Sequence, residues 1–202
     1  MGKQYLSDLK VPYININSEA AKRVNEKMEN LYFDSAKDFD SCAEEAIKGF
    51  EYGPSCSQIL TYRTYKYEDI LSVVVISSIQ ATSPWILNYN VFNFDLKTGD
   101  LINYDDMISK LGYDYDETNS KLKELLKKKM DELFGEHLDL STVCMNNSNC
   151  YDKAYDILDN DIKNNSLYFF AGDDGKLNVL VNAYCDVVQN GAVNFYLVTV
   201  EK

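Results

Sequence analysis

The chain has 202 residues, of which 46% are hydrophobic and 13% aromatic, and its formal net charge is −12. This composition excludes wholesale disorder, and a chain of this length can bury roughly 70% of its unfolded surface, enough for one large or two small domains. The excess of acids argues against binding a phosphate backbone, and the one lysine cluster, in residues 121–129, has the spacing of a solvated helix face, so we expect no nucleic-acid partner. The longest apolar run, residues 73–76, is too short to cross a bilayer, so we expect a soluble domain whose signal or anchor, if any, lies outside this segment.

The first half of the chain predicts a helix followed by a strand meander. Residues 11–16 are extended, and Asn17 or Ser18 is suited to cap a helix whose apolar residues recur at helical spacing until Gly49. Apolar, β-prone runs bounded by polar turns predict three strands, at residues 57–67, 70–80 and 85–96.

In the second half, the spacing of the apolar residues changes from that of a strand to that of a helix and back. Asp105 can cap a short helix that ends at Gly112, and longer apolar stripes predict helices at 117–134 and 151–162. Two apolar runs around Asp173-Asp174-Gly175 predict a tight hairpin, at residues 167–171 and 177–181. The last run, 193–200, is apolar on both faces, which predicts a strand in the interior of its sheet. Because strands and helices do not alternate, we expect an α+β fold, with an antiparallel or mixed sheet and helices mainly on one face.

Cysteine usage suggests an oxidising compartment. The chain has five cysteines, more than a cytosolic domain of this size needs. Cys144 and Cys150 flank a polar loop and form one candidate disulfide, and Cys42 with Cys56 forms a second, which leaves Cys185 unpaired. Five reduced thiols in a cytosolic protein remain the alternative interpretation.

The residues that carry common catalytic chemistry do not form a recognisable motif. The single histidine, His137, lies near a predicted helix end, and no CxxC pair accompanies it, so neither a nucleophile–base arrangement nor a zinc set is indicated. The acidic run that begins at Asp114 resembles a calcium loop, but it has Asn119 and Leu125 where glycine and glutamate are required, and a role at a helix start is simpler. We therefore predict no catalytic residue, metal site or cofactor, and expect that the chain is not an enzyme.

Aromatic side chains are the best candidates for recognition. The chain has 16 tyrosines, many of them in or beside predicted strands, where core packing with the hydroxyl at the rim is the simpler interpretation. For a binding function, we place partner contacts on strand-end loops, at Pro84, Trp85, Tyr89 and Tyr184.

Four blocks of the chain together resemble a known family. They are residues 11–28 (VPYININSEAAKRVNEKM), 69–75 (DILSVVV), 91–108 (VFNFDLKTGDLINYDDMI) and 166–184 (SLYFFAGDDGKLNVLVNAY). They resemble the paired extracytoplasmic modules of RsiV-type anti-sigma factors, which are also found before the catalytic domain of PdaC-type peptidoglycan deacetylases. The chain departs from the family's pattern at residues 81–87, where ATSPWIL replaces a stretch that often reads Gly-Gly-Ala-His.

The resemblance spans nearly the whole chain and implies two similar-sized modules in one compact unit. The first is a helix-plus-meander module at residues 5–95, and the second is a helix-plus-hairpin module at residues 96–202. It also implies a location outside the membrane in a Gram-positive bacterium, in many members behind an upstream anchor, and in the anti-sigma members a domain that binds lysozyme.

Two functions follow as hypotheses. The first is a non-catalytic, extracytoplasmic binding or sensing domain whose partner is a cationic, lysozyme-like protein or a cell-wall glycan. The alternative is a carbohydrate-active hydrolase that uses acids such as Asp105 and Asp186, or an accessory module of a peptidoglycan-modifying enzyme.

Overall fold

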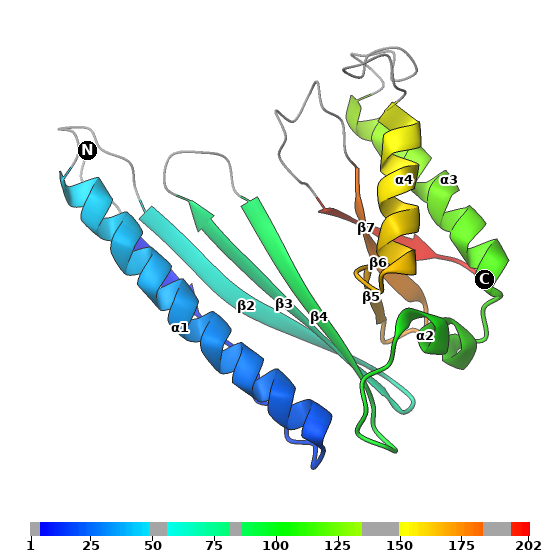
Figure 1. Ribbon diagram of the computed structural model, residues 1–202, viewed down its shortest axis with the longest axis horizontal. Coiled ribbons are helices and arrows are strands. Elements are labelled where there is room, and N and C mark those ends of the chain that lie inside the picture. The colour runs from blue at the N-terminus through cyan, green and yellow to red at the C-terminus, as the bar shows by residue number, and fades with distance from the viewer. Residues whose placement is uncertain (1–4, 49–55, 81–85, 135–149, 184–194) are drawn as a thin grey trace. The chain divides into compact units, whose positions relative to one another are not determined.

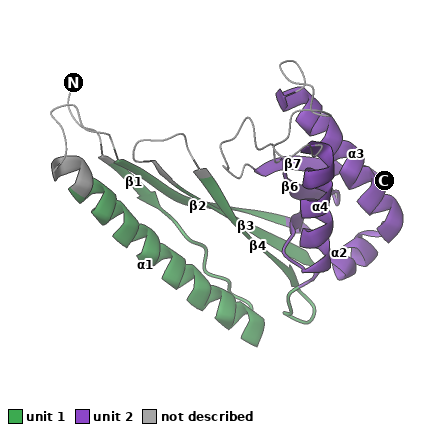
Figure 2. Ribbon diagram, turned by 45° about the horizontal axis from the view of Figure 1, so that its top comes forward, with its two compact units in different colours: residues 1–65, 69–101 green, residues 66–68, 102–202 purple. Residues whose placement is uncertain are grey.

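The computed structural model describes residues 5–48, 56–80, 86–134, 150–183 and 195–202. It has the predicted α+β fold, with a mixed four-stranded sheet, an antiparallel three-stranded sheet and four helices among these residues (Figure 1). The chain divides into two compact units, Met1–Tyr65 with Asp69–Leu101 and Lys66–Glu68 with Ile102–Lys202 (Figure 2). The boundary at residues 95/96 that the family resemblance implies stays a prediction.

The sheet of the first unit has the strand order β1-β2-β3-β4. Its strands are β1 (Tyr5–Leu9), β2 (Cys56–Tyr67), β3 (Ile70–Gln80) and β4 (Ile86–Asp95). β3 and β4 are antiparallel, with Val73 opposite Phe92. The two strands predicted to pair, at residues 57–67 and 70–80, are neighbours in the sheet as β2 and β3. The sequence did not predict β1, which runs parallel to β2. A five-residue strand whose partner lies far along the chain has no local signal in the sequence.

A single helix, α1 (Glu19–Lys48), covers one face of this sheet (Figure 1). The Ser18 hydroxyl fixes its start, because it accepts from the Ala21 N–H at 3.1 Å and donates to the Gly99 carbonyl at 2.7 Å. Gly99 has φ +78°, and a Cβ there would lie 2.7 Å from the Ser18 Cβ, so only glycine fits against the helix start. The buried cluster between helix and sheet contains Ile14, Ala20, Ala21, Val24, Met28, Leu60, Val73, Val75, Phe92 and Phe94.

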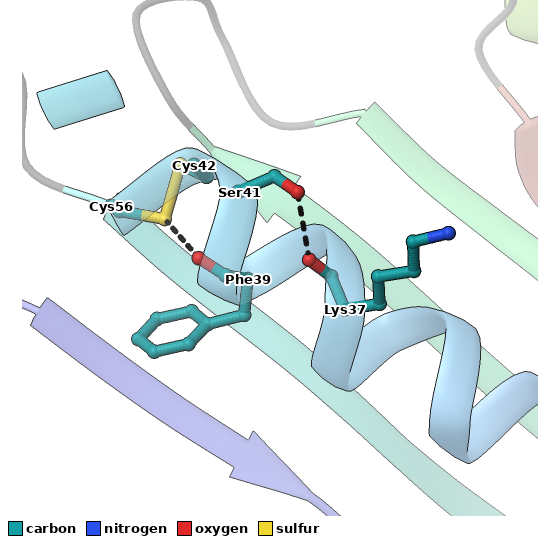
Figure 3. The surroundings of a disulfide bond; sticks show 5 residues. All are labelled: Lys37, Phe39, Ser41, Cys42 and Cys56. Atoms are coloured by element: carbon teal, nitrogen blue, oxygen red, sulfur yellow. Dashed lines mark hydrogen bonds between the residues drawn. A yellow bond between two sulfur atoms is a disulfide. The ribbon is translucent and has the colours of Figure 1, made fainter. Parts of the chain in front are cut away.

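A disulfide ties the far end of α1 to the sheet. Cys42 on α1 is bonded to Cys56 at the start of β2, with 6.0 Å between their Cα atoms (Figure 3). Both cysteines are buried, so the predicted Cys42–Cys56 pair is part of the folded unit. Cys150 is also buried and disulfide-bonded, whereas Cys144 and Cys185 lie outside the described residues.

The sheet of the second unit has the order β5-β6-β7, with β5 (Tyr168–Ala171), β6 (Leu177–Asn182) and β7 (Phe195–Val200). Gly175 in the hairpin has φ +75°, and the Gly172 N–H donates to the Lys176 carbonyl at 2.9 Å, as the Asp-Asp-Gly turn predicts. The expectation that the last strand lies in the sheet interior is wrong, because β6 is central and β7 is at an edge of the described sheet. β7 is apolar on both faces for another reason: Val198 and Val200 are buried, while the Phe195 ring lies 5.3 Å from that of Tyr168.

Three helices cover one face of this sheet: α2 (Tyr104–Leu111), α3 (Tyr115–Phe134) and α4 (Cys150–Lys163). The N-cap of α2 is Asn103 instead of Asp105, because the Asn103 side chain accepts from the Asp106 N–H at 2.8 Å. Asp105 lies in the first turn, where a carboxylate interacts favourably with the positive end of the helix dipole. None of the helices in the described ranges contains a stretch apolar and long enough to span a membrane.

Candidate functional site

The candidate site is a groove in the first unit, where the extended segment 11–13 runs beside the first half of α1. It has a volume of about 510 Å³. Its lining residues are Val11, Pro12, Tyr13, Asn25, Glu26, Met28, Glu29, Tyr32 and Phe33. One wall comes from the extended segment, the other from successive turns of α1.

The Asn25 amide holds the two walls together through two hydrogen bonds to Ile14, which we call the Asn25 clamp. Its Oδ1 accepts from the Ile14 N–H at 2.8 Å, and its Nδ2 donates to the Ile14 carbonyl at 3.0 Å. Both backbone groups of Ile14 are thus satisfied by one helix side chain, while the Ile14 side chain is buried in the core. Pro12 fixes its own φ two residues earlier, so the backbone that carries Tyr13 is restrained on both sides.

Large aromatic side chains stand exposed around the groove. Tyr13 is 80% exposed, Phe33 60% and Tyr32 38%, and the rings of Tyr32 and Phe33 meet edge to face at 5.8 Å between centroids. Phe33 lies off the apolar stripe of the helix, and Tyr32 lies at the edge of that stripe, so neither ring is part of the buried core. Exposed apolar groups gathered at a concave site are typical of a recognition surface.

The groove combines an apolar floor with an acidic rim. Met28 is buried at the floor with Pro12, and Glu26 and Glu29 are exposed beside them. Residues three apart on a helix have Cβ atoms about 5–6 Å apart, so these two carboxylates lie on the same face. The site can therefore hold an apolar group and, next to it, a positive charge.

The binding residues predicted from the sequence lie elsewhere. Tyr89 is a half-buried residue inside β4, opposite Ile76, and burial raises the pKa of its hydroxyl. Pro84, Trp85 and Tyr184 lie outside the described residues. The structure therefore does not bring these four side chains together as a described site.

The acidic residues considered for metal binding, turns or catalysis lie at helix starts and in a turn where they are described. Asp114 accepts from the Glu117 N–H at 2.9 Å at the start of α3, as expected for a residue that begins a helix. Asp174 accepts from the Lys176 N–H at 3.1 Å in the hairpin turn. Asp105 is exposed on α2, while His137 and Asp186 lie outside the described ranges. No group of three or more His, Cys, Asp or Glu suited to a metal ion occurs within the described part of the chain.

Sequence reasoning missed the groove, although the sequence contains a signal for it. The apolar stripe of α1 passes through Val24, Met28 and Leu31, so Phe33 is out of phase with it. Tyr13 likewise alternates outward between buried Pro12 and Ile14. What the sequence could not supply is that these out-of-phase aromatic residues meet across one groove.

Comparison with known proteins finds similarity among solved structures. No protein-family model matches the sequence, and neither does any curated protein. A crystal structure of a member of the DUF3298 family from Bacteroides fragilis is similar over 88% of this chain and 71% of that chain, with 13% sequence identity and a TM-score of 0.34. A similarity of this size carries no argument about function.

Proposed function

We propose that this chain is a non-catalytic binding domain that works outside the cytoplasm, at the envelope of a Gram-positive bacterium, and that its partner is a basic protein such as lysozyme. The observation that carries the proposal is the groove beside α1, with exposed aromatic residues on a restrained backbone and an acidic rim. The net charge of −12 would attract a basic partner and speed its encounter.

Two further observations support the proposed location and partner. The Cys42–Cys56 disulfide is compatible with an oxidising compartment. The sequence resemblance to RsiV-type anti-sigma factors favours an extracytoplasmic module and a lysozyme-like partner.

The alternative of a carbohydrate-active hydrolase has less support. A glycosidase places two carboxyl groups on either side of the bond that it cleaves. Of the two acids considered for that role, Asp105 is exposed in the first turn of α2, where it favours the helix start, and Asp186 lies outside the described residues.

Two parallel assays test the proposal. Calorimetric titration with hen egg-white lysozyme is expected to give saturable binding that weakens with salt. Separate incubation of the chain with purified peptidoglycan, followed by mass spectrometry, is expected to leave the glycan unchanged. Release of sugar fragments or of acetate by the chain alone would contradict a non-catalytic role, and a flat lysozyme titration would remove this partner.

A further inference from the structure

We infer that the groove recognises an arginine together with a neighbouring large apolar side chain on an exposed segment of the partner. This inference rests on the proposed binding function and names the chemistry that the groove selects. The guanidinium would lie against Glu26 and Glu29, and the apolar side chain would lie on the floor formed by Pro12 and Met28.

The first argument is that the acidic rim lacks a counter-charge within the described structure. Neither Glu26 nor Glu29 forms an ion pair or a side-chain hydrogen bond with any described residue. Their Cβ atoms lie about 5–6 Å apart on one helix face, so the two like charges repel each other and a cation placed between them would relieve that cost.

The second argument is that the lysines closest to the rim in sequence already interact elsewhere. Lys10 is 3.0 Å from Asp8, Lys22 is 2.6 Å from Glu19, and the Lys27 ammonium lies 5.3 Å from the centre of the Phe92 ring. Arg23 forms no ion pair with a described residue, so it does not neutralise the rim either. The missing positive charge is therefore expected from a partner.

The third argument distinguishes arginine from lysine. A guanidinium is planar, pairs with carboxylates through several N–H groups and stacks on aromatic rings, whereas an ammonium is a compact and strongly hydrated charge. The groove offers both kinds of contact, because Tyr13, Tyr32 and Phe33 stand beside the two carboxylates. The Asn25 clamp adds preorganisation, which lowers the entropy lost when a ligand binds.

The test uses a fluorescent, acetylated and amidated Gly-Leu-Arg-Trp-Gly-Ser peptide and the same peptide with citrulline in place of arginine. Citrulline keeps the shape of the side chain and removes its charge. Fluorescence anisotropy with the whole chain is expected to show binding of the arginine peptide, about tenfold weaker binding of the citrulline peptide, and intermediate binding of a lysine peptide.

Variants of the chain locate the effect. The double variant Glu26→Gln/Glu29→Gln is expected to weaken binding of the arginine peptide about tenfold and to leave the citrulline peptide unchanged. Phe33→Ala is expected to weaken the binding of both peptides, since it removes an apolar contact. Phe33 is 60% exposed, so this variant keeps its core.

Matched controls separate the groove from general effects. Asp34→Asn/Asp38→Asn makes the same change of net charge with exposed carboxylates of α1 that do not line the groove, and Tyr62→Ala removes an exposed aromatic side chain of β2. Both controls are expected to bind the peptide as the wild type does.

Equal binding of the arginine and citrulline peptides would overturn the inference, as would equal effects of the groove and control variants. So would the absence of binding to the wild type at millimolar peptide. The lysozyme titration decides the proposed function separately: if lysozyme binds wild type and groove variants alike, the domain still binds a protein, but not through this groove.

Discussion

Helix α3 of the second unit and the groove of the first unit differ in how their charged side chains are paired. In the second unit, lysines of α3 are paired with acids of α3 and α4, at 2.7 Å for Lys123 with Asp159 and 2.8 Å for Lys127 with Asp131. The Tyr104 side chain of this unit is fully buried, and its ring lies 5.3 Å from that of Phe169. Its hydroxyl donates to the Asn119 side chain at 2.9 Å, and burial raises the pKa of that hydroxyl. In the first unit, Glu26 and Glu29 have no described counter-charge, and Tyr13 and Phe33 are exposed.

This difference separates groups that stabilise the fold from groups that are available to a partner. A second groove, of about 430 Å³, lies along α3 and β7, but two of its charged residues are already engaged. Lys121 pairs with Glu117 at 2.8 Å, and Glu201 pairs with Lys176 at 2.8 Å. Glu26 and Glu29 form no such pair among the described residues, so we propose the first unit for recognition.

The largest expected effect contrasts a buried with an exposed phenylalanine of the first unit. Phe94→Ala is expected to lower the free energy of unfolding by about 3–5 kcal/mol, because Phe94 is fully buried in the core. Phe33→Ala is expected to change it by less than about 0.5 kcal/mol. Urea denaturation of both variants checks the contrast, and a large loss of stability for Phe33→Ala would show that Phe33 supports the fold.

The disulfide gives the next largest effect. Replacing Cys42 and Cys56 together by alanine is expected to lower the free energy of unfolding by about 2–4 kcal/mol, since the bond closes a loop with a sequence separation of 14. The double variant leaves the bond at Cys150 intact, which a reducing agent would not. An unchanged urea midpoint would mean that the bond does not stabilise this unit.

The Asn25 clamp links stability to recognition. Asn25→Ala leaves both backbone groups of Ile14 without their side-chain partner and is expected to cost about 1–3 kcal/mol. It is also expected to weaken peptide binding, because segment 11–13 loses its attachment to α1. Asn30→Ala, at an exposed position of the same helix, is the control. Loss of stability without loss of binding would show that the clamp is structural only.

The smallest expected effect concerns a paired charge of the second unit. The pKa of Asp131 is lowered by hydrogen bonds from Lys127 and Tyr151, so the charged carboxylate stabilises the folded state. This stabilisation is present above the unfolded-state pKa of about 3.9 and is lost as pH falls through the folded-state pKa. Asp131→Asn is expected to cost about 0.2–1 kcal/mol at neutral pH. The difference from wild type is expected to vanish in acid, and urea denaturation across pH measures it. A difference that grew in acid would have the wrong sign for this ion pair.

Most of the fold follows from local patterns in the sequence. The β3–β4 pair, the stripes of α1 and α3 and the Asp-Asp-Gly hairpin are set by periodicity and turn chemistry, which neighbouring residues encode. β1 and the edge position of β7 depend on pairings between distant segments. The sequence predicts the cap of α2 at Asp105, two residues after the actual cap at Asn103. Asn103, Asp105 and Asp106 are all suited to cap a helix, and only geometry distinguishes them.

The candidate site was less predictable than the fold. Trp85 and Tyr184 were chosen for residue type and expected loop position, whereas the groove forms because Asn25 holds segment 11–13 against α1. Hydrogen bonds between a side chain and a backbone in another segment leave no periodic signature. The unpaired state of Glu26 and Glu29 is likewise visible only once the positions of the neighbouring lysines are known.

The most direct test of the central claim is a nuclear magnetic resonance titration of the labelled chain with the arginine peptide. We expect amide shifts at Tyr13, Ile14 and residues 25–33, and smaller shifts in the Glu26→Gln/Glu29→Gln variant. Shifts confined to the second unit, or to the residues around Trp85 and Tyr89, would contradict recognition by the groove beside α1.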